Sequence, residues 1–289
     1  MSEAAKTVQL AGKPTQIGGE PDDPYFQNLE AQAEGLEVLA ALADRHVSRD
    51  AVVLDVGANI GLSTILLSRR VSSVIAYEPS PINLRHLHQN LARNGVTNVT
   101  VHETAVSERS AELRFHEAQF GAGSQVVTSD HIAFEGIPTI AVRAITLDNQ
   151  NLPPIAFIKL DVEGHEPEVL AGARGLLARD RPLIFSEVNI WCLCAFGGHS
   201  PGAYLRTLCG AFETWELDKG GVLTPISNTH KFLHDLIVFR RGITDIVLRP
   251  REAQRMPTLP ELSWPKQARS PAANASAKCA ASDLGALGR

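Results

Sequence analysis

Cysteine is scarce in this sequence, with four residues among 289. They form no Cys-x-x-Cys pair, and their spacing matches no evident disulfide framework, so we expect reduced thiols. Apolar runs of transmembrane length are also lacking, and the first residues do not show the basic-then-apolar pattern of a secretion signal. These absences favour a cytoplasmic protein without a transmembrane segment.

Basic residues are not in excess, because the formal net charge is -5 and the pI is about 6.1. A nucleic-acid backbone requires a basic surface, so composition argues against nucleic acid as the main partner. Hydrophobic residues make up 44% of the chain, which is enough for one sizeable α/β domain with appendages. We find no internal repeat.

The most informative segment is an apolar strand that runs into a glycine turn, Val52–Val56 followed by Gly57-Ala-Asn-Ile-Gly61. Glycines let a backbone turn tightly and approach a ligand closely. A second apolar run, Val74-Ile-Ala-Tyr-Glu78, ends in an acid at the usual distance for a ribose-binding carboxylate. The two segments together predict a site for a nucleoside-type cofactor.

This turn lacks the features of the commonest nucleotide sites. A dinucleotide site has three glycines spaced G-x-G-x-x-G, whereas Gly57 and Gly61 are separated by Ala58, Asn59 and Ile60. Asp55 precedes the turn, where it would repel a pyrophosphate and favour a cation. No Gly-Lys-Ser/Thr follows, which excludes a P-loop. The prediction is therefore a cofactor without phosphates.

These motifs resemble those of FkbM-type class I S-adenosylmethionine (AdoMet) methyltransferases. The resemblance covers roughly residues 50–240. It implies a Rossmann-like fold, AdoMet as cofactor, and methyl transfer to a hydroxyl of a sugar, glycolipid, polyketide or peptide-derived small molecule. The matching segments, in family order, are Asp55–Ser63, Tyr77–Pro79, Asn90–Gly95, Ala105–Ser107, Thr146–Asp148 and, most diagnostic, Ile158–Glu166.

Strand and helix patterns alternate along the chain and predict an α/β fold. We expect a Rossmann-like, seven-stranded, mostly parallel sheet with helices on both faces and a β-hairpin insertion at about residues 106–143. We interpret residues 1–26 as a mobile N-terminal arm, 27–248 as the methyltransferase domain and 249–289 as a disordered tail. Within the domain, a helix is predicted over 27–46 and a last strand over 233–239.

The resemblance also implies the cofactor-binding residues. The methionine part of AdoMet would lie against Asp55 and the turn, and Glu78 would accept hydrogen bonds from the ribose hydroxyls. Ala105 falls where the family's loop meets adenine. The implied set is Asp55, Gly57, Ala58, Asn59, Gly61, Glu78 and Ala105.

Acidic residues at the predicted strand ends are the candidate catalytic groups. Such a sheet binds ligands beyond the carboxyl ends of its strands, so the acids Asp55, Glu78, Glu103, Asp161 and Glu187 should lie along one rim. Among them Asp161 and Glu187, with Glu163 two residues beyond Asp161, are the candidates to deprotonate the acceptor hydroxyl. Glu163 and Glu166 could instead offset a helix dipole. Histidines are alternative bases: we interpret His165 as a surface residue and place His199 in a flexible loop.

Several alternatives stay open at this stage. Asp161, Glu187 and Asn189 could hold Mg²⁺, and we leave the metal unassigned. An N-methyltransferase acting on a small molecule or RNA is possible on this fold, although the Asn/Asp-Pro-Pro-Tyr/Phe turn common among such enzymes is missing. A non-catalytic AdoMet-binding module and a homo-oligomer are also compatible with the sequence. The acceptor itself cannot be identified from the sequence.

Overall fold

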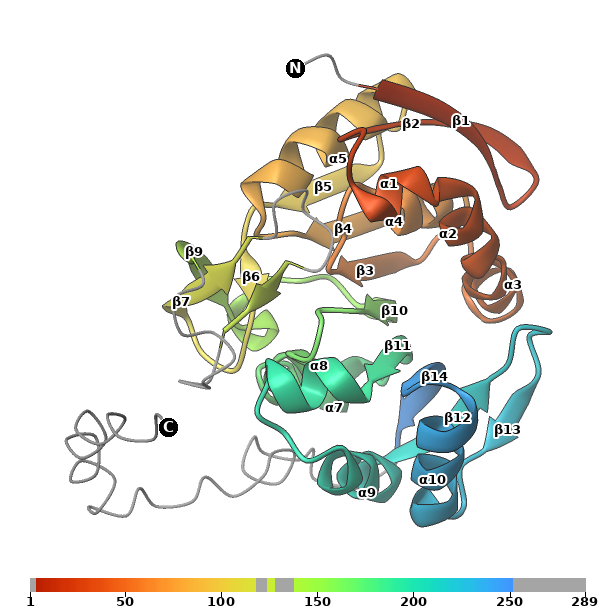
Figure 1. Ribbon diagram of the computed structural model, residues 1–289, viewed down its shortest axis with the longest axis vertical. Helices are drawn as coiled ribbons and strands as arrows, with labels where there is room; N and C mark the ends of the chain where they lie inside the picture. The colour runs from red at the N-terminus through yellow and green to blue at the C-terminus, as the bar shows by residue number, and fades with distance from the viewer. Residues whose placement is uncertain (1–3, 118–123, 128–137, 252–289) are drawn as a thin grey trace, which may run out of the picture.

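The computed structural model describes residues 4–117, 124–127 and 138–251, which are built around one eight-stranded sheet (Figure 1). Five neighbouring strands are parallel, in the order β11-β10-β3-β4-β5, and the other three are antiparallel. The strands are β3 (Val52–Val56), β4 (Ser73–Tyr77), β5 (Val99–His102), β10 (Ile155–Leu160), β11 (Leu183–Asn189), β12 (Phe212–Leu217), β13 (Leu223–Pro225) and β14 (Ile243–Pro250).

The expected Rossmann-like α/β architecture is confirmed, with one strand more than the seven predicted. The additional strand is β13, a three-residue edge strand that pairs with β12. A segment this short has too few residues to show the alternation by which a strand is recognised.

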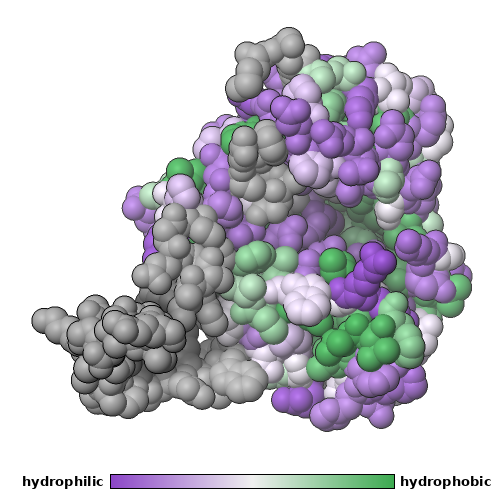
Figure 2. Space-filling model, in the orientation of Figure 1, coloured by the Kyte–Doolittle hydropathy of each residue, from purple (hydrophilic) through white to green (hydrophobic). Residues whose placement is uncertain are grey.

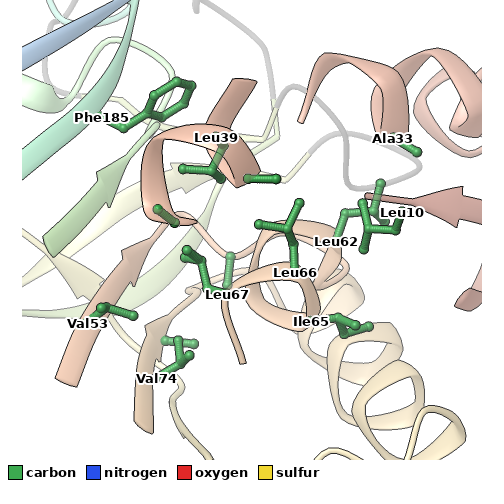
Figure 3. Close-up of a cluster of buried hydrophobic side chains, with 14 of the residues drawn as sticks. Leu10, Ala33, Leu39, Val53, Leu62, Ile65, Leu66, Leu67, Val74 and Phe185 are labelled. Atoms are coloured by element: carbon green, nitrogen blue, oxygen red, sulfur yellow. The ribbon is translucent and has the colours of Figure 1, made fainter. Parts of the chain in front are cut away.

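Helices cover both faces of the sheet and form two hydrophobic cores. One core joins the strands to α3 (Glu37–His46), α4 (Leu62–Ser68) and α5 (Pro81–Arg93). Figure 3 shows part of it, with Leu39 of α3 and Leu66 of α4 among side chains from the sheet. The second core contains α6 (Glu166–Ala171), α7 (Arg174–Asp180), α8 (Ile190–Ala195), α9 (Pro201–Ala211) and α10 (Thr229–Phe239).

The N-terminal segment differs from the predicted mobile arm. It forms a hairpin of β1 (Ala4–Leu10) and β2 (Lys13–Gly19), followed by the short helices α1 (Pro24–Gln27) and α2 (Leu29–Gly35). Val8, Leu10 and Ile17 are buried in the first core. The glycine and proline content of this segment suggested an irregular structure. The hairpin was not recognised because two short strands joined by a two-residue turn show little hydrophobic periodicity. The helix predicted over 27–46 is broken into α2 and α3 at Leu36.

The last strand was predicted in the wrong place. Residues 233–239 belong to the helix α10, whose first turn is capped by the Asn228 side chain accepting from Lys231 N at 2.9 Å. Phe232 and Leu236, four residues apart, are its buried positions. The run Leu-Ile-Val-Phe at the end of α10 suggested a strand, whereas three of these four side chains, Ile237, Val238 and Phe239, face solvent. The strand is β14, which starts at Ile243.

The insertion contains the predicted hairpin pairing. It forms a four-stranded sheet of order β6-β9-β7-β8, in which β7 pairs antiparallel with both β8 and β9. Its strands are β6 (Ala105–Val106), β7 (Ala111–His116), β8 (Gln125–Val126) and β9 (Ile140–Ile145), followed by the 3-10 turn η2 (Leu147–Asn149). Most of the predicted glycine turn at 120–124 and the predicted tail beyond residue 251 lie outside the described residues.

Hydrophilic side chains cover most of the upper part of the face in Figure 2, over the N-terminal hairpin and α5. Hydrophobic residues gather in the lower part of that view. Within the described parts of the chain, no helix has the combination of length and apolar character that a membrane crossing requires.

Candidate active site

A cavity of about 410 Å³ lies beyond the carboxyl ends of β3, β4, β10 and β11. This is the edge at which open parallel sheets bind ligands, and the volume is within the usual range for small-molecule sites. The N-terminal helices supply one wall through Tyr25, Gln32 and Leu36, and the insertion supplies another through Phe115 and Gln125. The cavity thus combines segments that are far apart in the sequence.

The glycine turn after β3 fits its neighbours closely. Gly57 has φ +84, and a Cβ there would lie 1.8 Å from the carbonyl oxygen of Asp161. Gly61 has φ +100, and a Cβ would lie 2.7 Å from Leu87 Cδ1. The backbone N–H groups of Gly57 and Ala58 both donate to Tyr77 O, at 3.0 and 3.1 Å. Only glycine fits these two positions, which hold Ala58 and Asn59 against the cavity.

Asp55 lies behind this turn and not in the cavity wall. Its fully buried carboxyl accepts from Ser63 Oγ at 2.8 Å and from Thr64 Oγ1 at 2.6 Å. Burial raises the pKa of Asp55, and Lys159 together with the two hydroxyls opposes that rise. Asp55 therefore positions α4 and the turn. Among the predicted cofactor residues, Gly57, Ala58, Asn59, Glu78 and Ala105 line the cavity, whereas Asp55 and Gly61 support it from behind.

Glu78 follows β4 and lines the cavity with a buried carboxylate. Its Oε2 accepts from Asn59 N at 2.8 Å, while Oε1 accepts from Ser80 N at 2.9 Å and Asn83 Nδ2 at 3.3 Å. Burial raises the pKa of Glu78, and these hydrogen bonds oppose the rise. A carboxylate has about four acceptor positions. Glu78 therefore holds the turn and keeps capacity for a ligand hydroxyl.

Three buried polar atoms near Glu78 lack a protein partner. The Tyr77 hydroxyl, Asn83 Oδ1 and Thr104 Oγ1 have no hydrogen-bond partner among the described residues, and the three residues that carry them line the cavity. Buried polar atoms are almost always satisfied, so their position indicates a polar ligand at this end of the cavity. Sequence reasoning missed all three, although each lies within five residues of a predicted cofactor residue.

Lys159 joins the turn to the acidic part of the site. Its buried ammonium donates to Gly57 O at 2.7 Å and lies 3.3 Å from Asp161 Oδ2 and 3.7 Å from Asp55 Oδ1. Burial disfavours the charged form, but Asp161 and Asp55 outweigh burial and raise the pKa of Lys159 above its usual value. The lysine therefore stays charged and occupied by these three partners.

The structure brings the three predicted catalytic acids into the wall of one cavity. Asp161, Glu163 and Glu187 all line it, and so does Asp245, which lies opposite Glu187 in the pairing of β14 with β11. Burial, aided by Asp161, Glu163 and Asp245, raises the pKa of Glu187 to about 9. Burial, aided by Asp161, raises the pKa of Asp245 to about 6. Asp245 was missed because the last strand was predicted too early in the chain.

Glu163 and Glu166 have different roles in the loop after β10. Glu163 has φ +54 and accepts from Cys192 Sγ at 3.1 Å. Glu166 is buried, and its Oε1 accepts from Val162 N at 3.0 Å and from Gly164 N at 3.3 Å. Glu166 thus shapes the loop at the start of α6, while Glu163 lines the cavity.

His165 is buried, so its interpretation as a surface residue was wrong. Its Nε2 lies 3.0 Å from Ser107 Oγ, and its Nδ1 lies 3.4 Å from Glu168 Oε2. His199 is also buried, with Nε2 3.0 Å from Glu168 Oε1. His165 lines the cavity, whereas His199 is not among the residues that line it. Both imidazoles contact the Glu168 carboxylate, which connects the loop before α9 to α6.

One of the possible Mg²⁺ ligands, Asn189, uses its side-chain oxygen within its own segment. Asn189 Oδ1 accepts from Trp191 N and Cys192 N, both at 3.2 Å, and so caps α8. Within the described ranges, no group of three or more His, Cys, Asp or Glu side chains is placed to hold a metal ion.

Comparisons with known proteins agree with this geometry. Residues 55–199, half of the chain, match the model of the methyltransferase FkbM domain. Hexuronic acid methyltransferase AglP of Haloferax volcanii is 30% identical over 154 residues, which are 53% of this chain and 60% of that protein. 2-O-methyltransferase NoeI of Sinorhizobium fredii is 25% identical over 207 residues, 65% of this chain and 83% of that protein.

The crystal structure of methyltransferase FkbM from Methylobacillus flagellatus KT aligns with a TM-score of 0.44 and 18% identity, covering 78% of this chain and 55% of that one. The chain spans about three-fifths of the length of the first two curated relatives it matches, 60% and 58%. The match to the family model over half of its length establishes that the chain belongs to the methyltransferase FkbM domain family.

Proposed function

We propose that the protein transfers a methyl group from AdoMet to a hydroxyl of a sugar or a similar small molecule. The observation that carries this proposal is one cavity with unpartnered polar atoms around Glu78 at one end and carboxyl groups around Asp161 at the other. The names of two relatives, a hexuronic acid methyltransferase and a 2-O-methyltransferase, support a sugar hydroxyl as the acceptor.

The residues of the cavity fit the parts of AdoMet. Glu78 is acceptor-only when ionised and suits the ribose diol. Ala58 and Asn59 form the surface for the methionine part, while Thr104 and Ala105 lie where the adenine would be held. When bound, AdoMet supplies a methyl group that the acceptor oxygen attacks in line.

The acceptor hydroxyl must lose its proton as the new bond forms. Glu187, with its pKa raised to about 9, keeps its proton at neutral pH and can donate a hydrogen bond to the acceptor. Asp161 is better suited as the base, because its carboxylate lies 3.3 Å from the Lys159 ammonium and is 37% exposed. Glu163, held by Cys192, would orient the acceptor.

Amide variants test this assignment. Asp161→Asn should leave AdoMet affinity near that of the wild type and lower the methylation rate at saturating AdoMet by about 10²–10⁴-fold, the usual effect of losing a general base. Glu103→Gln is a matched control, since Glu103 is exposed, faces His88 and does not line the cavity.

Calorimetry gives the AdoMet dissociation constant, and mass spectrometry of a glycan and natural-product panel gives the rate and the methylated atom. Protein that does not bind AdoMet would overturn the proposal. Methylation at a nitrogen would show that an amine, and not a hydroxyl, accepts the methyl group.

A further inference from the structure

Four carboxyl groups form one end of the cavity, which we call the acidic wall: Asp161, Glu163, Glu187 and Asp245. They come from the loop after β10, from β11 and from β14. Glu187 and Asp245 are register partners on adjacent strands, so their side chains point to the same face of the sheet. The acidic wall lies beyond the turn that would hold the methionine part of AdoMet, which is where an acceptor would have to bind.

Positive charge is scarce around the acidic wall. Lys159 is the one lysine or arginine among the described residues that line the cavity. Its ammonium already forms ion pairs with Asp55 and Asp161 and a hydrogen bond to Gly57 O. The sulfonium of AdoMet adds one charge. Burial, aided by Asp161, Glu163 and Asp245, raises the pKa of Glu187 to about 9, so Glu187 keeps its proton at neutral pH. Glu163 and Asp245 then face the single positive charge of the sulfonium.

A second observation shows that this cavity is built for a polar ligand. The Tyr77 hydroxyl and Asn83 Oδ1 belong to residues that are 1% and 4% exposed, line the same cavity and lack a partner among the described residues. They mark the cavity as a binding site independently of the acids. The acidic wall then selects, by charge, the part of the ligand that lies beyond the cofactor.

A metal ion is a poorer occupant than an organic cation. A divalent ion requires oxygen ligands that converge within about 2.0–2.6 Å of one point. The described residues hold no group of three such side chains in that arrangement. A protonated amine requires only facing carboxylates at hydrogen-bonding distance from its three N–H groups.

We propose that the acceptor carries a protonated amine close to the hydroxyl that is methylated, as in an amino sugar, and that the acidic wall excludes acceptors carrying a carboxylate. This inference rests on the proposed methyl transfer and specifies its substrate class. The amine pairs with Asp245 and Glu163, while the hydroxyl faces Asp161. A uronic acid would add a further negative charge beside Asp161, Glu163 and Asp245.

The test uses three methyl glycosides that differ at one group: a glucoside, a 2-amino-2-deoxyglucoside and a glucuronide. Binding is measured by saturation-transfer NMR with S-adenosylhomocysteine present, and methylation by mass spectrometry with AdoMet. We expect the amino glycoside to be preferred over the glucuronide by at least about tenfold in affinity or kcat/KM, because partly buried charges interact strongly. Equal use of the three glycosides, or preference for the glucuronide, overturns the inference.

Asp245→Asn should reduce the preference for the amino glycoside by about tenfold while AdoMet affinity stays unchanged. Asp235→Asn is the matched control, because Asp235 lies on α10 beside Lys231 and away from the cavity. An unchanged preference in Asp245→Asn overturns the role of the wall.

Two further outcomes are distinguishable. If AdoMet does not bind, the proposed function itself fails. If AdoMet binds but the amino glycoside binds no better than the others until Mg²⁺ is added, the wall is a metal site and the amine inference is wrong.

Discussion

At the scale of single residues, Gly57 is the position where the sequence has least freedom. Its positive φ and its close approach to the Asp161 carbonyl oxygen couple the glycine turn to the loop that carries the candidate catalytic acids. Any side chain there must displace one of the two segments.

Gly57→Ala should therefore destabilise the protein more than a change that only strains the backbone. We expect a loss of about 3 kcal/mol or more from strain and overpacking together, seen as a lower urea midpoint. Gly95→Ala separates the two effects, because Gly95 also has a positive φ, +62, but nothing lies within 4 Å of its Cβ position. Equal losses in the two variants would show that the contact with Asp161 is unimportant.

Glu78→Ala should weaken AdoMet binding by about 1.5–3 kcal/mol, the scale of hydrogen bonds to a charged group. The variant also frees the N–H groups of Asn59 and Ser80, so the melting temperature must be measured beside the dissociation constant. Calorimetry that returns the wild-type constant for a folded variant would remove Glu78 from the site.

Residue positions were predictable where the chain order alone decides them. Acids after consecutive parallel strands must meet at one edge, so Asp161, Glu163 and Glu187 were foreseen. The direction of a side chain was not. Asp55 turns toward Ser63 and Thr64, and His165 turns inward to Ser107, because tertiary neighbours and not local sequence determine these partners.

At the scale of elements, a buried amide helps to attach the N-terminal hairpin to the domain, beside the apolar contacts of Val8, Leu10 and Ile17. The Asn90 side chain of α5 accepts from Gly18 N at 2.7 Å and donates to Gly18 O at 3.0 Å and to Ile60 O at 2.8 Å. This residue links β2, α5 and the cofactor turn.

Asn90→Ala should destabilise the protein by about 2–3 kcal/mol, because the backbone groups of Gly18 and Ile60 lose their buried partner. Amide exchange in residues 4–19 should accelerate more than in the sheet. Asn94→Ala is the control, since Asn94 bonds Gln16 in the same way at an exposed site. Equal exchange rates in the two variants would contradict the role of Asn90 in holding the N-terminal hairpin.

A strand with a continuous apolar run was predictable from the sequence, as the exact agreement for β3 shows. The predictions of elements were wrong where local composition and tertiary context favour different structures. The hairpin is short and rich in glycine, and α10 ends in residues with high β propensity. Both are fixed by burial against a core that the sequence does not display.

At the scale of the whole molecule, the concentration of buried carboxyls couples folding to pH. Burial raises the pKa of Glu166 from 4.5 to about 8 and that of Glu187 to about 9. Above pH 4.5 the unfolded chain has released these protons while the folded chain keeps them, so stability falls as pH rises toward 9. Carboxyls with a lowered pKa, such as Glu168, change the stability of the protein only at pH values below this range.

Thermal unfolding of the protein without ligands should therefore show a melting temperature that declines from about pH 5 to pH 9. Glu187→Gln should flatten this decline and raise the melting temperature at pH 9 by a few degrees, with roughly 2–4 °C expected for each kcal/mol in a domain of this size. Glu103→Gln should follow the wild-type profile. A wild-type profile that is flat or rises over this range would contradict the burial of uncompensated acids.

The walls of the cavity come from both sides of the segment that matches the family model. Tyr25, Gln32 and Leu36 precede residue 55, and Asp245 follows residue 199. The segment that matches the family model and its flanks thus both contribute residues to the cavity wall. Substitutions in the flanks can therefore reshape the cavity while the family segment is left intact, and we expect chimaeras that exchange only the flanks between relatives to differ from their parents in the ligands that they accept.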